Sequence, residues 1–170
     1  MRRLYRWLLN MRFVPYVLLF SVILTALNIL TSKLPFADFT NSTTEHISSF
    51  ALMFYYSFIQ APIAETLIFQ ALPIGIGCIV LKHWQLGSFR LRKFTWLLII
   101  ASAAMFSAFH NYHWSYVIAT FITGFFLAFA YYVAQKRKQN AFITVTLIHA
   151  CINIAPVVQD VIKGRITSFF

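Results

Sequence analysis

The sequence predicts an all-α fold, a polytopic transmembrane helical bundle of about five to six helices. Of its 170 residues, 60% are hydrophobic and only 11% are charged, whereas a soluble domain carries about 25% charged residues. The apolar residues form blocks long enough to cross a bilayer, which takes about 20 residues per helix. The 19 Phe and 8 Tyr residues suit lipid-facing and interfacial positions. We therefore expect one compact integral membrane protein.

The formal net charge of +10 does not indicate nucleic-acid binding, because of where the basic residues lie. They gather at the ends of the apolar blocks in three clusters: Arg2, Arg3, Arg6 and Arg12; Lys82, Arg90, Arg92 and Lys93; and Lys136, Arg137 and Lys138. This distribution is the positive-inside pattern of membrane loops. We expect the lipid bilayer to be the partner of these charges, and we predict no nucleic-acid partner.

The first elements are a basic N-terminal arm at 1–12, a helix at about 13–31 and a polar loop that ends near His46. The apolar run of this helix is long for the core of a signal peptide, and no A-x-A cleavage site follows it. We therefore interpret it as a retained transmembrane helix. Together with the segment up to residue 59, these helices and the loop form the N-terminal part of the chain.

The next apolar stretch, 47–81, is too long for one simple span. We predict two helices broken at Gln60-Ala61-Pro62, because proline suits the first turn of a helix and disfavours helix in the residue before it. Pro73 should kink the second of these helices and free the carbonyl of Phe69. In a membrane, a neighbouring group must then satisfy that carbonyl.

A basic loop at 82–93 and helices at about 94–110, 114–134 and 140–158 complete the predicted core, 60–158. A C-terminal tail, 159–170, follows it. The two cysteines, Cys78 and Cys151, fall inside apolar segments and are predicted to be reduced packing residues.

The three basic clusters share the cytoplasmic face only if the long apolar stretch, 47–82, makes one net crossing of the membrane. Otherwise one half of this stretch is re-entrant or oblique, or the N-terminal arm breaks the positive-inside rule. The sequence leaves these alternatives open.

Glu65 is the only acidic residue in the apolar body of the chain, since Asp38, Glu45 and Asp160 lie in or beside predicted loops. A carboxylate inside a bilayer costs about 3 kcal/mol on insertion scales, so its default interpretation is functional. We expect Glu65 in the first turn of a helix that starts at Pro62, where the helix dipole favours a negative charge.

Three polar residues on later apolar segments are candidate partners of Glu65. His110 closes an F-x-x-x-H pattern that starts at Phe106, and an H-x-x-x-N pattern joins His149 to Asn153. Residues four apart share a helix face, so His149 and Asn153 should point the same way and Phe106 should pack beneath His110. The directions of the predicted helices bring all three patterns to a similar depth in the bilayer.

Such a cluster can support hydrolysis. Glu65 can accept a proton from water as a general base, and His110 can hold the same water. His149 and Asn153 can donate hydrogen bonds to the oxyanion that develops on a peptide carbonyl. Zinc is the alternative: Glu65, His110 and His149 could bind it and leave one position open. Taken singly, a membrane histidine or asparagine usually hydrogen-bonds between helices.

The other histidines carry a weaker signal. His113 stands three residues after His110 and could share its helix face as a metal ligand, but we interpret it as interfacial because Trp114 follows it. His46 and His83 lie in predicted loops.

At these residues the chain resembles the CPBP family, the CAAX proteases and bacteriocin-processing enzymes, which are intramembrane endopeptidases. The family's first motif, E-E-x-x-x-R after A-P, is matched in divergent form by Ala61-Pro62-Ile63-Ala64-Glu65-Thr66-Leu67-Ile68-Phe69-Gln70. The second motif, F-x-x-x-H, matches Phe106 to His110, and the third, H-x-x-x-N or D, matches His149 to Asn153. The resemblance covers residues 60–158.

The resemblance implies a hydrolase in which Glu65 activates water, His110 helps hold that water, and His149 and Asn153 stabilise the oxyanion. It implies prenylated CAAX proteins or peptides as substrates, or a role in self-immunity to bacteriocins. The family's common name, metalloprotease, raises the question of a bound metal. Because no organelle-retrieval signal is visible, we expect a bacterial plasma membrane protein.

Two positions depart from the family pattern: Thr66 replaces the second glutamate, and Gln70 replaces the arginine. Residues four apart face each other on a helix, so the family's pair could form an ion pair, and Thr66 and Gln70 could hydrogen-bond instead. We interpret these two residues as structural support for the site. The same departures favour the alternative, a non-catalytic member that acts in immunity or as a binding partner. A third hypothesis, a transporter or proton relay, lacks any visible repeat of broken helices.

Overall fold

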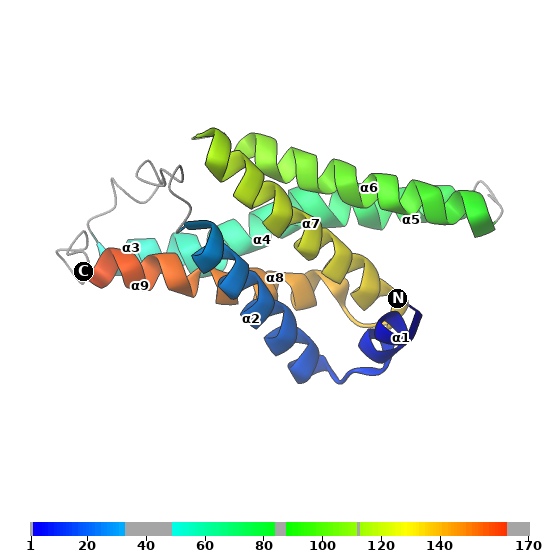
Figure 1. Cartoon of the computed structure of the whole chain (residues 1–170), viewed down its shortest axis with the longest axis horizontal. Coiled ribbons are helices and arrows are strands. Elements are labelled where there is room, and N and C mark those ends of the chain that lie inside the picture. The colour runs from blue at the N-terminus through cyan, green and yellow to red at the C-terminus, as the bar shows by residue number, and fades with distance from the viewer. Residues whose placement is uncertain (1, 33–48, 84–87, 112, 163–170) are drawn as a thin grey trace.

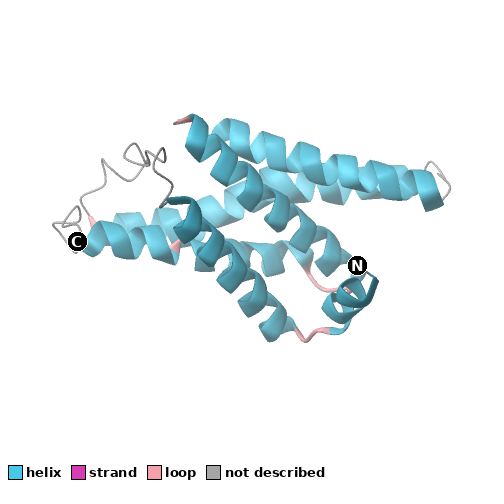
Figure 2. Cartoon of the chain, in the orientation of Figure 1, coloured by secondary structure: helices cyan, strands magenta, loops and turns pink. Residues whose placement is uncertain are grey.

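The computed structural model describes residues 2–32, 49–83, 88–111 and 113–162, and every regular element within these ranges is a helix (Figures 1 and 2). The prediction of an all-α bundle is therefore confirmed. Four helical segments of this part of the chain are long and apolar enough to cross a membrane: Phe13–Thr31, Phe50–Val80, Trp114–Lys136 and Ala141–Val158. A shorter apolar helix runs from Lys93 to Phe109. The chain is an integral membrane protein.

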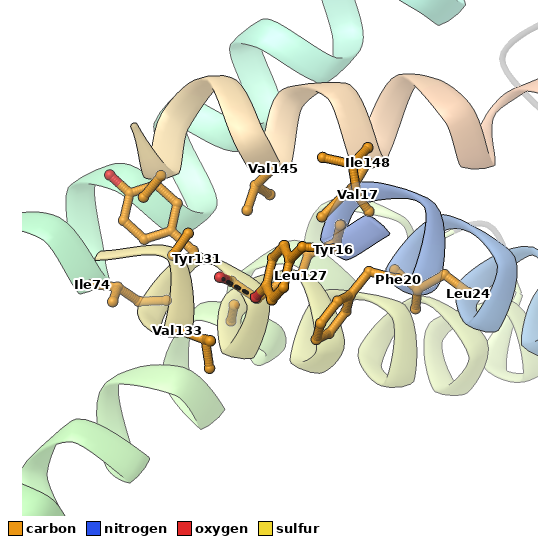
Figure 3. Packing of buried hydrophobic residues seen from close by; sticks show 14 of the residues in the cluster. Tyr16, Val17, Phe20, Leu24, Ile74, Leu127, Tyr131, Val133, Val145 and Ile148 are labelled. Carbon is orange, nitrogen blue, oxygen red and sulfur yellow. Dashed lines mark hydrogen bonds between the residues drawn. The ribbon is translucent and has the colours of Figure 1, made fainter. Parts of the chain in front are cut away.

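The N-terminal helices pack across the middle of the bundle. Helix α1 (Arg2–Asn10) buries Leu8, and helix α2 (Phe13–Ser32) packs against α7 and α8. The hydroxyl of Tyr16 donates a buried hydrogen bond of 2.9 Å to the carbonyl of Ala130, at the centre of the apolar core (Figure 3). The guanidinium of Arg137 lies over the same tyrosine ring and donates to the carbonyl of Met11. These contacts fix the turn between α1 and α2 against the end of α7.

The long apolar stretch forms one continuous helical rod, so the predicted break at Gln60-Ala61-Pro62 is wrong (Figure 1). The rod consists of α3 (Phe50–Phe54), the π-helical segment η2 (Tyr55–Gln60), α4 (Ala61–Glu65), the π-helical segment η3 (Thr66–Ile76) and α5 (Gly77–His83). Directly before Pro62, the N–H of Ala61 donates to the carbonyl of Tyr56, five residues back. This π-type pattern accommodates the missing N–H of proline without ending the helix.

The segments that carry the three basic clusters gather at one end of the molecule. Helix α1, the end of α5 and the end of α7 all lie there (Figure 1). A single net crossing of the membrane by the rod would give this placement under the positive-inside rule.

Pro73 lies inside η3, and the prediction for the carbonyl of Phe69 is confirmed. The hydroxyl of Ser102, on helix α6 (Ser88–Phe109), donates a hydrogen bond to this carbonyl in the buried interface between the two helices. Pro73 has no N–H to donate to the Phe69 carbonyl, and a hydroxyl of a neighbouring helix donates to it instead. A membrane interior requires such a partner.

Replacing Ser102 with Ala should remove the interhelical hydrogen bond of the Phe69 carbonyl and destabilise the protein by about 1 kcal/mol. The loss should be smaller when Pro73 is replaced with Ala as well, because residue 73 then supplies an N–H. Thermal unfolding in detergent of the four members of this double-mutant cycle measures the coupling. Ser107→Ala, which removes a hydroxyl bound to the carbonyl of Val117, is the matched control and should show no coupling to Pro73.

The C-terminal half also differs from the predicted boundaries. Helix α6 begins at Ser88, so much of the predicted basic loop 82–93 is helical, in keeping with the helix propensity of Lys and Arg. Helix α7 (Trp114–Lys136) crosses next. The predicted helix 140–158 is divided at Asn153 into α8 (Ala141–Ile152) and α9 (Ile154–Ile162). Cys78 and Cys151 are free thiols, as expected.

Candidate active site

Glu65 lies at the midpoint of the span Phe50–Val80, where α4 passes into η3. The expectation that it occupies the first turn of a helix is therefore wrong, and the helix dipole offers its carboxylate no support. The physical reason is the π-helical turn before Pro62, which lets the helix continue upstream. A carboxylate in the middle of a membrane span strengthens the functional interpretation.

The predicted partners of Glu65 converge on one of its oxygens. His110 Nε2 lies 3.7 Å from Glu65 Oε2, and His149 Nε2 lies 3.5 Å from the same atom. The Glu65 side chain is 23% exposed and that of His149 only 5%. The three groups come from α4, the end of α6 and α8, so the chain folds three distant segments around one carboxylate oxygen.

The orientation of His110 follows from its other ring nitrogen. His110 Nδ1 lies 2.7 Å from the backbone carbonyl of Phe106. A carbonyl only accepts hydrogen bonds, so Nδ1 carries the hydrogen, and Nε2 of the neutral ring presents a lone pair. His110 Nε2 and Glu65 Oε2 are thus two acceptors that face each other across 3.7 Å. A water molecule that donates one hydrogen to each fits this geometry.

Phe106 packs beneath His110, as the four-residue spacing predicts. Its ring centroid lies 4.4 Å from that of His110, 5.8 Å from that of His149 and 5.6 Å from that of Phe69. Phe106 is 3% exposed. It therefore positions His110 twice, through its ring and through its carbonyl.

Gly124 on α7 is a contributor to the site that the sequence analysis misses. A Cβ at this position would lie 3.0–3.2 Å from atoms of Phe106, tighter than most Cβ contacts, so this glycine lets α7 approach α6 without pressing on that side chain. An isolated glycine inside an apolar helix is the signal that could have identified it.

Replacing Gly124 with Ala should push Phe106 out of place and destabilise the protein by about 1–3 kcal/mol through overpacking. Gly75→Ala is the matched control, because its Cβ would meet the nearest atom, Tyr131 Oη, at an ordinary 3.4 Å. That change should be neutral, or stabilise the helix by up to about 1 kcal/mol. Melting temperatures in detergent compare the two variants, and equal melting temperatures would contradict the role assigned to Gly124.

Asn153 follows the last residue of α8, four residues after His149, and its amide already has a partner. Its Nδ2 donates a hydrogen bond of 2.8 Å to the carbonyl of Ser57 in η2, while its backbone N–H bonds the carbonyl of His149. The amide group has two hydrogens, so one remains for another acceptor. The bond to Ser57 ties the end of α8 to the long rod, a role that the H-x-x-x-N spacing alone does not indicate.

The hydrogen bond expected between Thr66 and Gln70 does not form. Both side chains are 0% exposed. Thr66 Oγ1 and both polar atoms of the Gln70 side chain have no hydrogen-bond partner among the residues that the structure describes. The expectation that spacing alone would join the two side chains is therefore wrong, because proximity on one helix does not fix the rotamers that a hydrogen bond needs.

His113 caps a helix. Its Nδ1 accepts a hydrogen bond from the backbone N–H of Ser115, at the N-terminus of α7, and lies 2.9 Å from the Ser115 hydroxyl. His83 ends α5, and His46 lies outside the described residues.

The sequence also offers Glu65, His110 and His149 as ligands for zinc. Across the described parts of the chain, no group of three or more His, Cys, Asp or Glu side chains is arranged to hold a metal ion. Glu65, His110 and His149 are therefore not arranged as a metal site in this structure.

A comparison with protein families finds one model that covers these residues. The family described as type II CAAX prenyl endopeptidase Rce1-like matches residues 47–155, a region that includes Glu65, His110, His149 and Asn153. The comparisons with curated proteins and with solved structures return no match.

Proposed function

Because the chain belongs to the type II CAAX prenyl endopeptidase Rce1-like family, we propose that it is an intramembrane peptidase in which Glu65 activates a water molecule. The observation that carries this proposal is the approach of two imidazole nitrogens to one oxygen of Glu65, at 3.5 and 3.7 Å. The three side chains are 5–23% exposed, and partial burial within the bundle strengthens their electrostatic interactions.

The first step is the attack of water on a peptide carbonyl. The water donates one hydrogen to Glu65 Oε2 and the other to His110 Nε2, and its oxygen points at the carbonyl carbon. Glu65 takes a proton as the oxygen–carbon bond forms. The Phe106 carbonyl holds His110 in the tautomer that can accept this hydrogen bond.

The second step is stabilisation and collapse of the tetrahedral intermediate. His149 and the remaining amide hydrogen of Asn153 donate to the oxyanion. As the oxyanion re-forms a carbonyl, the carbon–nitrogen bond breaks and the proton held by Glu65 passes to the leaving amine. The products are a new carboxylic acid, which then releases its proton to solvent, and a new amine.

The surroundings of Glu65 favour a substrate that arrives through lipid. Ile63, Leu67 and Ile68 on the same rod are 42–47% exposed, and in a bilayer this surface contacts acyl chains. Glu65 itself retains 23% of its side-chain exposure, so a substrate can reach it. We propose a lipidated CAAX-type protein or a membrane-associated peptide as the substrate.

A second candidate function is a non-catalytic family member that binds a partner or acts in bacteriocin self-immunity. The observation that favours it is the replacement of the family's motif glutamate and arginine by Thr66 and Gln70. This candidate needs a folded bundle but no water-activating group.

Hydrolysis in water enriched in oxygen-18 separates the two functions. The protein in lipid nanodiscs is incubated with a prenylated CAAX peptide, and mass spectrometry should find one labelled oxygen in the new carboxylate. An intact peptide after long incubation would overturn the proposed peptidase. Parallel samples with a chelator and with added zinc test a metal requirement: loss of cleavage on chelation and recovery with zinc would assign one.

A further inference from the structure

Unpaired polar atoms gather around one turn of the long rod. Among the described residues, nine buried side-chain nitrogen or oxygen atoms have no hydrogen-bond partner. Four of the nine belong to this turn: Glu65 Oε2, Thr66 Oγ1, Gln70 Oε1 and Gln70 Nε2. A fifth, Nδ1 of His149, belongs to the α8 side chain that contacts Glu65. Native proteins leave few such atoms, so a concentration of this kind needs a physical explanation.

Within this turn, the side chains of Thr66 and Gln70 are closed to lipid and to bulk solvent. Thr66 and Gln70 are 0% exposed, and η3 packs against α6, α7 and α8. A glutamine amide offers two donors and an acceptor, and a threonine hydroxyl offers a donor and an acceptor. A small neutral molecule that both donates and accepts hydrogen bonds matches this set, whereas a buried ion would lack a counter-charge.

We propose that Thr66 and Gln70 bind ordered water inside the bundle, beside Glu65. Buried waters typically make about three hydrogen bonds to polar groups that otherwise lack partners, and these two side chains supply them. We further infer that this water orders the molecule that Glu65 activates, an inference that rests on the proposed peptidase function. Thr66 and Gln70 are then positioning residues for the nucleophile, without contact to the substrate.

The water itself can be observed without any activity. A crystal structure of the wild-type protein, at a resolution that shows individual waters, should reveal water within hydrogen-bond distance of Thr66 Oγ1 and of the Gln70 amide. A dry contact between these side chains and apolar atoms would overturn the site, whether or not the protein cleaves peptides.

The role in turnover is tested with variants that keep the shape of each side chain. Thr66→Val and Gln70→Met should lower kcat several-fold and leave KM unchanged, because substrate binding is not altered. Thr144→Val is the matched control: Thr144 is also 0% exposed, but its hydroxyl serves the carbonyl of Asn140, away from Glu65. Its kcat should stay at the wild-type value.

Two results would contradict this role. Wild-type kcat in both variants would show that the water does not order the nucleophile. A rise in melting temperature in both variants would show that the polar atoms are dry, because removing unpaired buried polar groups stabilises a protein. If the wild-type protein cleaves no peptide, the proposed peptidase function is wrong. The crystal structure would still show whether Thr66 and Gln70 bind water.

Discussion

Replacing Glu65 with Gln is expected to lower peptide turnover by about a hundredfold or more, because the amide cannot take a proton from water. Gln keeps the size of Glu and removes only the basic oxygen. The two imidazoles that approach Glu65 Oε2 at 3.5 and 3.7 Å can both hydrogen-bond an amide, so the helices should stay assembled. Single-turnover kinetics in nanodiscs measures the chemical step directly.

Two controls make this prediction specific. The melting temperature of Glu65→Gln should stay close to the wild-type value, which shows that lost turnover is not lost folding. Asp160→Asn makes the same chemical change at a residue of α9 and should leave kcat unchanged. If Glu65→Gln keeps more than a tenth of wild-type turnover, Glu65 is not the base.

The same variant separates the other hypotheses. A binding or immunity protein would keep its function in Glu65→Gln, because recognition does not require proton transfer. A proton relay would lose a pH-dependent response without forming any peptide product. Comparing membranes that hold the wild-type protein with membranes that hold the variant should show a cleavage product only in the former.

Hydropathy and residue spacing predict the helices and the contacts around Glu65 well, because a bilayer permits few solutions. A backbone surrounded by lipid must satisfy its own hydrogen bonds, so apolar blocks become helices. A single carboxylate in such a block needs polar partners, and His110 and His149 are among the few available. Spacing also predicts correctly that Phe106 packs against His110.

The predictions that the structure contradicts share a different cause: local structure depends on the neighbouring helices. Proline rules predict a break at Pro62, but a π-helical turn keeps the rod continuous. Spacing predicts a bond between Thr66 and Gln70, but it does not fix their rotamers. The roles of Ser57, Ser102 and Gly124 depend on contacts with other helices, which a single sequence does not specify.

Replacing Gln70 with Arg alone is expected to destabilise the protein by about 3–5 kcal/mol, because it places an unpaired charge inside the bundle. Gln70 is 0% exposed and lies on η3 among α6, α7 and α8. A long side chain at this depth cannot reach the membrane surface. Thermal or denaturant unfolding in detergent measures the loss.

Adding Thr66→Glu to Gln70→Arg should recover most of that stability, because the two residues restore the family's Glu–Arg pair four positions apart. Gln135→Arg is the matched control: Gln135 is half-buried in the last turn of α7, next to Lys136, where an arginine can extend its charge to water. It should change stability little. If the single and double variants melt alike, Thr66 and Gln70 do not act as a pair. Their joint departure from the family pattern would then be two independent changes rather than a replaced structural support for Glu65.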